Sequence, residues 1–134
     1  MRTIVFISLF FLSCHLGQAQ VFIGKEKDTV KELMKGEREF ALDVTSKNTV
    51  YNTLKYVDNM QTRTYLFLFD ENDTCTLSKL MCDYKYLNRI IKKLDEKYVA
   101  TEEGQWTYNE DGKKYLITLK KGDWFFSVIT KKAE

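Results

Sequence analysis

The sequence predicts an α+β domain in which an antiparallel sheet of about six strands carries two helices packed on one face, in the order α-β-β-β-α-β-β-β. Apolar residues recur with helical spacing in two stretches, and each stretch precedes segments rich in β-branched and aromatic residues. Glycines stand where one periodic stretch gives way to the next, which is typical of caps and turns. These glycines are Gly24, Gly36, Gly104, Gly112 and Gly122.

The first residues have the features of a secretory signal peptide. Arg2 precedes an apolar run over 4–12, which is too short to span a bilayer as a helix. Small residues follow, and we place the cleavage site between Ala19 and Gln20. As an alternative, FLSC resembles a degenerate lipobox that would attach a lipid to Cys14. We therefore expect a secreted or periplasmic protein, or one that is lipid-anchored through Cys14.

With a signal peptide over 1–19, residues 20–134 would form a single small α+β domain, which is long enough for one core. Loss of Arg2 leaves 20 basic and 19 acidic side chains. This balance argues against nucleic acid as a partner, because phosphate binding needs clustered and uncompensated Lys and Arg. We also expect no transmembrane segment after the signal, since no second apolar run of membrane length follows.

His15 is the only histidine, and it is lost with the predicted signal peptide. The remaining chain then lacks the base of Ser-His and Cys-His mechanisms and has no imidazole for a metal. We expect no catalytic residue, no metal and no cofactor. The favoured function is a non-enzymatic binding or accessory domain of the cell envelope, with an envelope protein or a small ligand as partner. The alternative is a small secreted enzyme that uses carboxylate, Lys or thiolate chemistry.

Two stretches have the apolar spacing of amphipathic helices. The first, KEKDTVKELMK, is expected to end at Gly36. The second, YKYLNRIIKKLDEKY, has Arg and Lys opposite its apolar stripe and is preceded by Asp83 as a plausible N-cap. The residues that must be buried are Val30, Leu33 and Met34 in the first helix, and Tyr84, Leu87, Ile90, Ile91 and Leu94 in the second.

Three strands are predicted between the helices, over 50–58, 63–70 and 74–82, because these segments are rich in β-branched and aromatic residues. The segment 37–49 has no clear pattern, although REFALDV within it is compatible with one more strand. The polar stretch DENDT between the last two strands lacks the Gly and the closing Glu of a calcium-binding EF-hand loop, so we predict a hairpin turn there.

Two turns set the predicted register of the last three strands. A type I′ turn at DG pairs Tyr108 with Tyr115, and a second at KG, residues 121–122, pairs Leu119 with Trp124. We assign the face that these turns bring together to the core. It holds Trp106, Tyr108, Tyr115, Ile117, Leu119, Trp124, Phe126 and Val128.

The opposite face of these strands mixes apolar and small hydroxyl side chains, and a wet sheet face is usually more polar. Two interpretations remain open. Residues 37–49 or a partner cover this face, or it is a binding surface, since exposed apolar patches with polar rims often mark interaction sites. The residues concerned are Leu116, Thr118, Phe125, Ser127 and Ile129.

The stretch CTLSKLMC holds the only cysteines that follow the predicted signal peptide. Seven positions separate Cys75 from Cys82. An extended strand would hold their Cα atoms about 23 Å apart, whereas a disulfide tolerates about 7 Å. The odd spacing also places the side chains on opposite faces of a regular strand. We therefore predict no disulfide, but two separate thiols buried as small hydrophobes.

Glu102 and Glu103 are adjacent, so on a strand they would face opposite ways, and we interpret TEEGQ as a solvated turn rather than a carboxylate pair. The stretch IGKEKDTVKELM resembles the first helix of small envelope lipoproteins with a β-lactamase-inhibitor-like fold, without the second helix expected directly after it. CDYKYLNRIIKKL and GDWFFSV are similar to segments of secreted Bacteroidota proteins, which implies a periplasmic or surface location. Neither resemblance transfers a functional residue.

Overall fold

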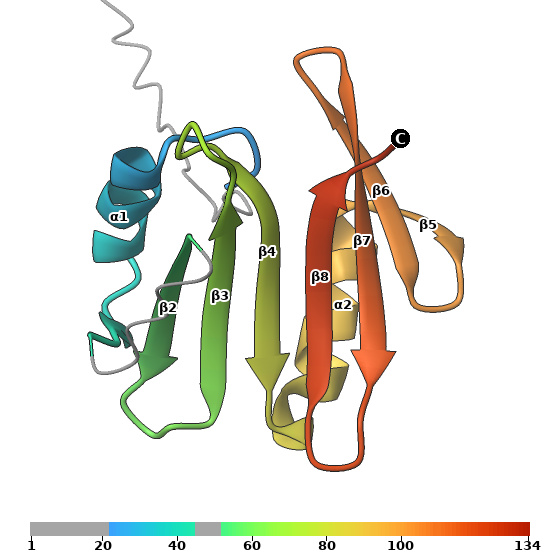
Figure 1. Cartoon of the computed structure of the whole chain (residues 1–134). Helices are drawn as coiled ribbons and strands as arrows, with labels where there is room; N and C mark the ends of the chain where they lie inside the picture. Colours follow the sequence, from blue (N-terminus) through green and yellow to red (C-terminus); the bar gives the residue numbers. More distant parts are fainter. Residues whose placement is uncertain (1–21, 45–51) are drawn as a thin grey trace, which may run out of the picture.

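The computed structural model describes residues 22–44 and 52–134. Within them the chain forms one antiparallel sheet of eight strands, with two α-helices and one short 3₁₀ helix (Figure 1). The predicted signal peptide, its cleavage site and Cys14 lie outside the described residues. In chain order the elements are α1 (Lys27–Lys35), β1 (Phe40–Leu42), β2 (Thr53–Asp58), β3 (Arg63–Phe69), β4 (Cys75–Cys82), η1 (Tyr84–Tyr86), α2 (Leu87–Lys97), β5 (Val99–Glu102), β6 (Gln105–Glu110), β7 (Lys113–Lys121) and β8 (Phe126–Lys132).

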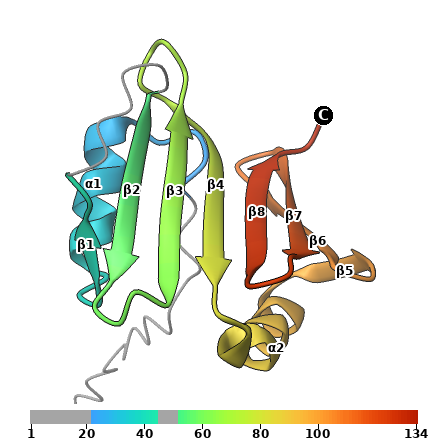
Figure 2. The same cartoon turned by 60° about the horizontal axis from the view of Figure 1, so that its bottom comes forward.

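The strand order is β1-β2-β3-β4-β8-β7-β6-β5, so β4 and β8 pair at the centre of the sheet (Figures 1 and 2). Each half of the sheet is therefore one helix followed by four strands, and the predicted order of three strands after each helix was wrong. The two additional strands are β1 and β5. Both are short edge strands, and every residue of β5 is exposed, so neither has the alternation of apolar and polar residues that reveals a strand.

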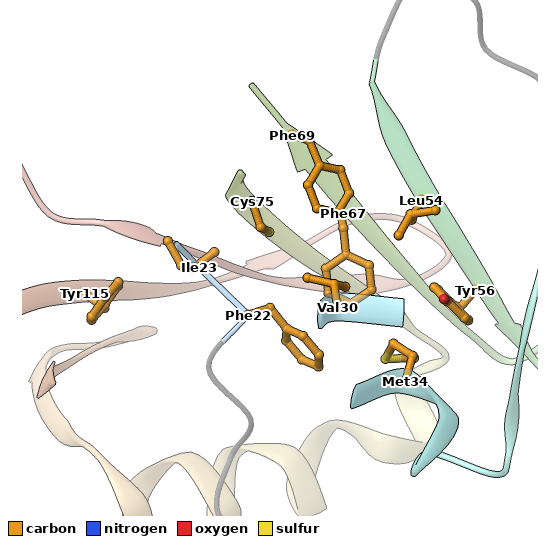
Figure 3. Close-up of a cluster of buried hydrophobic side chains, with 10 residues drawn as sticks. All are labelled: Phe22, Ile23, Val30, Met34, Leu54, Tyr56, Phe67, Phe69, Cys75 and Tyr115. Atoms are coloured by element: carbon orange, nitrogen blue, oxygen red, sulfur yellow. The ribbon is translucent and has the colours of Figure 1, made fainter. Parts of the chain in front are cut away.

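Helix α1 follows the sequence prediction closely. It ends at Gly36, whose N–H donates to the Leu33 carbonyl at 3.1 Å, and the Glu37 N–H donates to the Met34 carbonyl at 3.0 Å. Val30 and Met34 are fully buried against β2, β3 and the start of β4 (Figure 3). The buried members of this first core cluster are Phe22, Ile23, Val30, Met34, Leu54, Tyr56, Phe67, Phe69, Cys75 and Tyr115.

Phe22 and Ile23 belong to this core although the sequence gives no sign of it. The segment that follows them is tied to the start of β4 by two backbone hydrogen bonds. The Gly24 N–H donates to the Cys75 carbonyl at 2.8 Å, and the Cys75 N–H donates to the Lys25 carbonyl at 2.8 Å. Gly24 has φ of +82°, a conformation that favours glycine. The apolar run over 21–23, just after a predicted signal peptide, is too short to form a recognisable periodic element.

The second core cluster lies between α2 and the strands β4, β6, β7 and β8. The predicted apolar stripe of α2 contacts this cluster, and Asp83 accepts a hydrogen bond from the Lys85 N–H at 3.0 Å, so it caps η1. Trp106 Nε1 donates to Asp95 at 2.8 Å and ties β6 to α2. The buried members are Cys82, Leu94, Trp106, Ile117, Phe126 and Val128.

The register of β6 and β7 is the predicted one, whereas the register of β7 and β8 is not. Asp111 has φ of +51° and the next residue, a glycine, has +74°, as a type I′ turn requires, and Tyr108 faces Tyr115. Leu119, however, pairs with Val128, and Trp124 is 88% exposed in a four-residue loop. The slip of four residues is even, so Phe126 and Val128 keep the predicted face.

Both cysteines lie on the same face of the sheet, contrary to the prediction. Phe69 pairs with Cys75 and Leu68 pairs with Leu77, so Thr76 is an extra residue in β4. This β-bulge changes the parity of the strand and turns Cys75 toward the face that holds Cys82. Both are free and fully buried.

Candidate functional site

The predicted binding surface is only partly assembled by the fold. Leu116 and Thr118 in β7 and Ser127 and Ile129 in β8 lie on the sheet face away from the helices, with Thr118 opposite Ile129. Ser127 is only 6% exposed, and Phe125 lies in the loop before β8 rather than on the strand face. A binding role for this face stays a prediction.

The described part of 37–49 does not cover that face, because β1 extends the edge of the sheet beside β2. Residues 45–49 lie outside the described part of the chain. The position of β1 at the edge of the sheet could not be predicted from the sequence, since REFALDV is compatible with a strand at several places in the sheet.

A cleft of about 390 Å³ opens on the other face, the face that carries both helices. Its floor consists of residues from β3, β4, β7 and β8. One wall comes from η1 and α2, and the other from Phe22, Glu37 and Phe40. The cleft therefore lies over the central β4–β8 pair, between η1 and α2 on one side and the segments that flank α1 on the other.

Hydroxyl groups lie in the middle of the floor. Ser78 on β4 stands directly opposite Thr130 on β8, and Tyr65 lies on β3 one strand away. Among the described residues, none of these three hydroxyls has a hydrogen-bond partner. No fully buried side-chain N or O there lacks a partner, so the Ser78 hydroxyl, in a residue only 8% exposed, must reach the cleft. The Ser78 hydroxyl is thus available to form a hydrogen bond with a molecule in the cleft, although the rest of the residue is buried.

Tyr65 also connects the floor to the aromatic wall. Its ring centroid lies 6.1 Å from that of Phe22 and 5.0 Å from that of Phe40. Burial, followed by the nearby carboxylate of Glu37, raises the pKa of Tyr65 above its ordinary value. The phenol therefore stays protonated at neutral pH and can donate a hydrogen bond.

Helix α2 places a row of cations along the rim. Arg89, Lys93 and Lys97 are four residues apart and so lie along one side of the helix, and all three line the cleft and are exposed. Arg89 and Lys93 form no ion pair with any described residue. Glu37 is the one carboxylate among the described lining residues. The rim is therefore positively charged.

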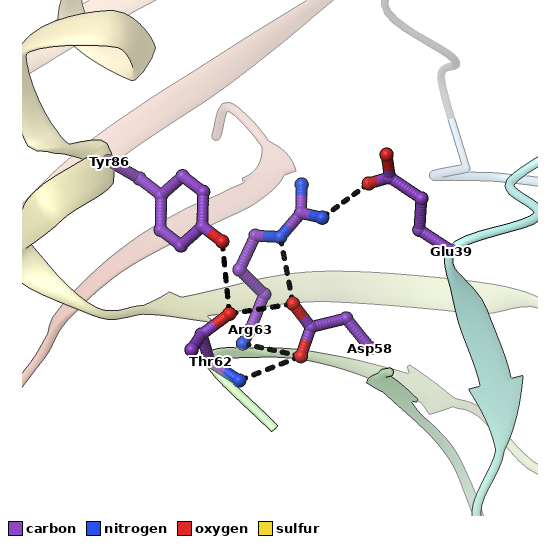
Figure 4. Close-up of polar contacts among 5 residues, drawn as sticks. All are labelled: Glu39, Asp58, Thr62, Arg63 and Tyr86. Carbon is purple, nitrogen blue, oxygen red and sulfur yellow. Dashed lines mark hydrogen bonds and ion pairs between the residues drawn. The ribbon is translucent and has the colours of Figure 1, made fainter. Parts of the chain in front are cut away.

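A fourth cation, Arg63, is engaged in a polar network at one end of the cleft (Figure 4). Arg63 Nε lies 3.2 Å from Asp58, and its guanidinium also pairs with Glu39. The Thr62 hydroxyl lies within hydrogen-bond distance, 3.0 Å, of the Tyr86 hydroxyl. The guanidinium carbon is 4.9 Å from the Tyr86 ring centroid. The network thus joins the β2–β3 hairpin to η1 and fixes the wall of the cleft.

Asp58 is the centre of this network. It accepts hydrogen bonds from the Thr62 N–H at 2.7 Å, the Thr62 hydroxyl at 2.7 Å and the Arg63 N–H at 3.0 Å. Burial by itself raises the pKa of Asp58, but the hydrogen bonds from Thr62 and Arg63 outweigh burial and hold this pKa below its ordinary value. Asp58 is therefore an ionised structural group rather than a proton donor.

The two thiols are poor nucleophiles. Burial raises the pKa of Cys75 to about 11 and that of Cys82 to about 12, so both remain protonated at neutral pH. Neither cysteine lines the cleft.

The acidic stretches have structural positions. In DENDT the Asp70 carboxylate accepts from the Asn72 and Thr74 N–H groups at 2.9 and 3.0 Å, which confirms the predicted hairpin turn. Glu102 and Glu103 are both exposed, and a turn at Glu103 and Gly104 confirms part of the predicted turn. The turn is shorter than predicted, because Glu102 ends β5 and Gln105 begins β6. No group of three or more His, Cys, Asp or Glu within 22–44 and 52–134 could hold a metal ion.

The cleft residues were missed by sequence reasoning for two reasons. The cations of α2 were recognised only as the polar side of an amphipathic helix, although their spacing of four was visible. Ser78 could not be placed opposite Thr130, because the sequence does not show that β4 pairs with β8.

Comparison with known proteins gives no match, since no family model, curated protein or solved structure is similar to this chain. In the described part of the chain, no helix is long and apolar enough to cross a membrane. Functional inference therefore rests on the geometry and chemistry of the cleft.

Proposed function

We propose that this protein is a small, non-enzymatic binding domain of the cell envelope, and that a small molecule binds in the cleft over β4 and β8. The observation that carries this proposal is the Ser78 hydroxyl, which is nearly buried, has no hydrogen-bond partner among the described residues and opens into a cleft of about 390 Å³. Small-molecule sites typically have volumes of about 300–1,000 Å³, apolar walls and a few polar groups. The cleft has these properties.

The proposed location outside the cytoplasm is supported by the first residues. Arg2, the apolar run over 4–12 and the small residues before Gln20 occur in the order of a signal peptide. Cleavage after Ala19 would release a secreted or periplasmic protein, and lipid attachment at Cys14 would instead anchor it.

The alternative of a small secreted enzyme has less support. Cys75 and Cys82 are protonated at neutral pH and lie away from the cleft. The Asp58 carboxylate is occupied by hydrogen bonds from Thr62 and Arg63. The groups that line the cleft are better suited to hold a ligand than to transform it.

Native mass spectrometry of the protein after incubation with a small-molecule extract tests the proposal. Thr130→Phe would fill the cleft, and Ile129→Phe makes a similarly large substitution on the neighbouring residue, which faces the other side of the sheet. We expect the wild type and Ile129→Phe to retain the same bound mass and Thr130→Phe to lose it, with unchanged near-UV circular dichroism in both variants. Loss only in Ile129→Phe would place binding on the opposite face, and the absence of any bound mass would contradict the proposal.

A further inference from the structure

We infer that the ligand of this cleft is a small organic anion, with its acidic group against the hydroxyls of Ser78 and Thr130 and its apolar body against the aromatic wall. This inference rests on the proposed function and specifies the chemical class of the ligand. Three independent properties of the cleft support it.

The first property is the charge of the rim. Arg89 and Lys93 line the cleft without an ion pair to any described residue, and Lys97 continues the same row. Glu37 is the single described carboxylate on the lining. A cationic ligand would be repelled by this rim, whereas an anion would be attracted before and after entry.

The second property is the chemistry of the floor. Ser78 and Thr130 face each other across β4 and β8, so their Cβ atoms are about 4.5–5.5 Å apart, as in other directly opposed residues. Each hydroxyl has one proton to donate, and a carboxylate or sulfonate presents several acceptor oxygens. An anion can accept both protons at once, and hydrogen bonds to a charged acceptor are stronger than bonds to a neutral one. The pair therefore suits an acidic group better than a neutral amide or alcohol.

The third property is the size and surface of the space around the hydroxyls. Phe22, Phe40 and Tyr65 contribute aromatic rings on one side, and Leu80 and Val128 form an apolar strip of the floor. A volume of about 390 Å³ accommodates a compact organic molecule but not a folded partner. An inorganic anion would leave the apolar surface uncovered, so the ligand should carry an aromatic or aliphatic body.

A pair of fluorescent probes separates these contributions. Anilinonaphthalene sulfonate is an anion with an aromatic body, and N-phenylnaphthylamine has the same aromatic skeleton without the sulfonate. We expect the anionic probe to bind the folded protein at least about tenfold more tightly than the neutral probe, because a charge-assisted contact is added. Thr130→Phe should abolish binding of the anionic probe.

The cation row is tested with matched variants of α2. The double variant Arg89→Gln/Lys93→Gln should lose most of the preference for the anionic probe while keeping weak binding of the neutral one. Lys92→Gln removes one positive charge from an exposed residue of the same helix outside the cleft, and should leave the preference unchanged. Arg89→Gln alone, which also removes one charge, should reduce the preference. A thermal shift with each probe confirms that the folded protein is the species that binds.

The outcomes distinguish the two levels of inference. The anionic class would be overturned if the two probes bind with equal affinity, if Thr130→Phe abolishes the binding of both, and if Arg89→Gln/Lys93→Gln changes neither affinity. The cleft would then remain a binding site. Binding that persists in Thr130→Phe, or no binding of either probe, would overturn both the ligand class and the cleft as the site.

Discussion

Asp58 shows how a single buried carboxylate positions one wall of the cleft. It is 5% exposed and accepts hydrogen bonds from Thr62 and Arg63, which also contact Tyr86 on η1. A buried charge is costly unless it is paired and hydrogen-bonded, and here both conditions are met. Removal of the carboxylate would leave the Arg63 guanidinium without its buried partner.

We expect Asp58→Asn to destabilise the protein at neutral pH by about 1–3 kcal/mol, the usual cost of an unsatisfied buried donor. The folded-state pKa of Asp58 is lowered, so its contribution is complete above the unfolded value near 3.9 and is lost as pH falls through the lower folded value. The stability difference between wild type and Asp58→Asn should therefore shrink below about pH 4. Urea unfolding as a function of pH measures this.

Glu39→Gln is the control for this experiment. Glu39 pairs with the same guanidinium, but its side chain is 70% exposed, and exposed ion pairs contribute about 0–1 kcal/mol. A difference between wild type and Asp58→Asn that stays constant from neutral to strongly acidic pH would show that the carboxylate is not the stabilising group.

For single residues, the sequence predicted a role where the interaction partner is close in the chain, but not where the partner is distant. The role of Asp83 as a cap was predictable, because the capping partner is two residues away. The role of Asp58 was not, because its network also involves Glu39 and Tyr86, which are distant in the chain. The proposed role of Ser78 likewise depends on Thr130, which lies opposite it on β8, a strand distant in the chain.

The β7–β8 connection shows how one turn decides the position of a tryptophan. Gly122 does not adopt positive φ, which a type I′ turn would require. Instead its N–H donates to the Phe125 carbonyl at 2.9 Å, and a Cβ at this position would lie 2.8 Å from that oxygen. The glycine permits a close approach of backbone in a four-residue loop, which leaves Trp124 at the tip.

We therefore expect Trp124→Ala to change the free energy of unfolding by less than about 0.5 kcal/mol, as at other exposed positions. Phe126→Ala, two residues later, should cost about 3–5 kcal/mol because its ring is fully buried. Denaturant unfolding of the two variants gives both values. Equal costs would support the two-residue turn and the burial of Trp124.

Elements with strong periodicity were predictable, and those without it were not. Both helices and six of the strands coincide with apolar patterns, because burial on one side forces a period on the sequence. The edge strands β1 and β5 are held mainly by backbone pairing with β2 and β6, which is independent of side-chain type. The bulge at Thr76 has no glycine or other local marker.

The whole molecule should unfold in one transition, because the β4–β8 ladder joins the two core clusters. Met34→Ala in α1 and Leu94→Ala in α2 should each cost about 2–5 kcal/mol. Both tryptophans belong to the second half of the chain, and Trp106 is buried there. The loss of stability in Met34→Ala should therefore shift the unfolding curve followed by tryptophan fluorescence as much as the curve followed by circular dichroism. A fluorescence curve unaffected by Met34→Ala would show that the halves unfold separately.

The two halves of the chain have the same topology on either side of the antiparallel β4–β8 pair. In strand order, α1 with β1–β4 corresponds to α2 with β5–β8 by an approximate two-fold relation, since each half runs from an edge strand to the central pair. Such a relation is what an isologous homodimer of one helix and four strands would have, with the last strand of each copy at the interface. Here one polypeptide carries both copies of the motif, so the association of the two halves is intramolecular and independent of protein concentration.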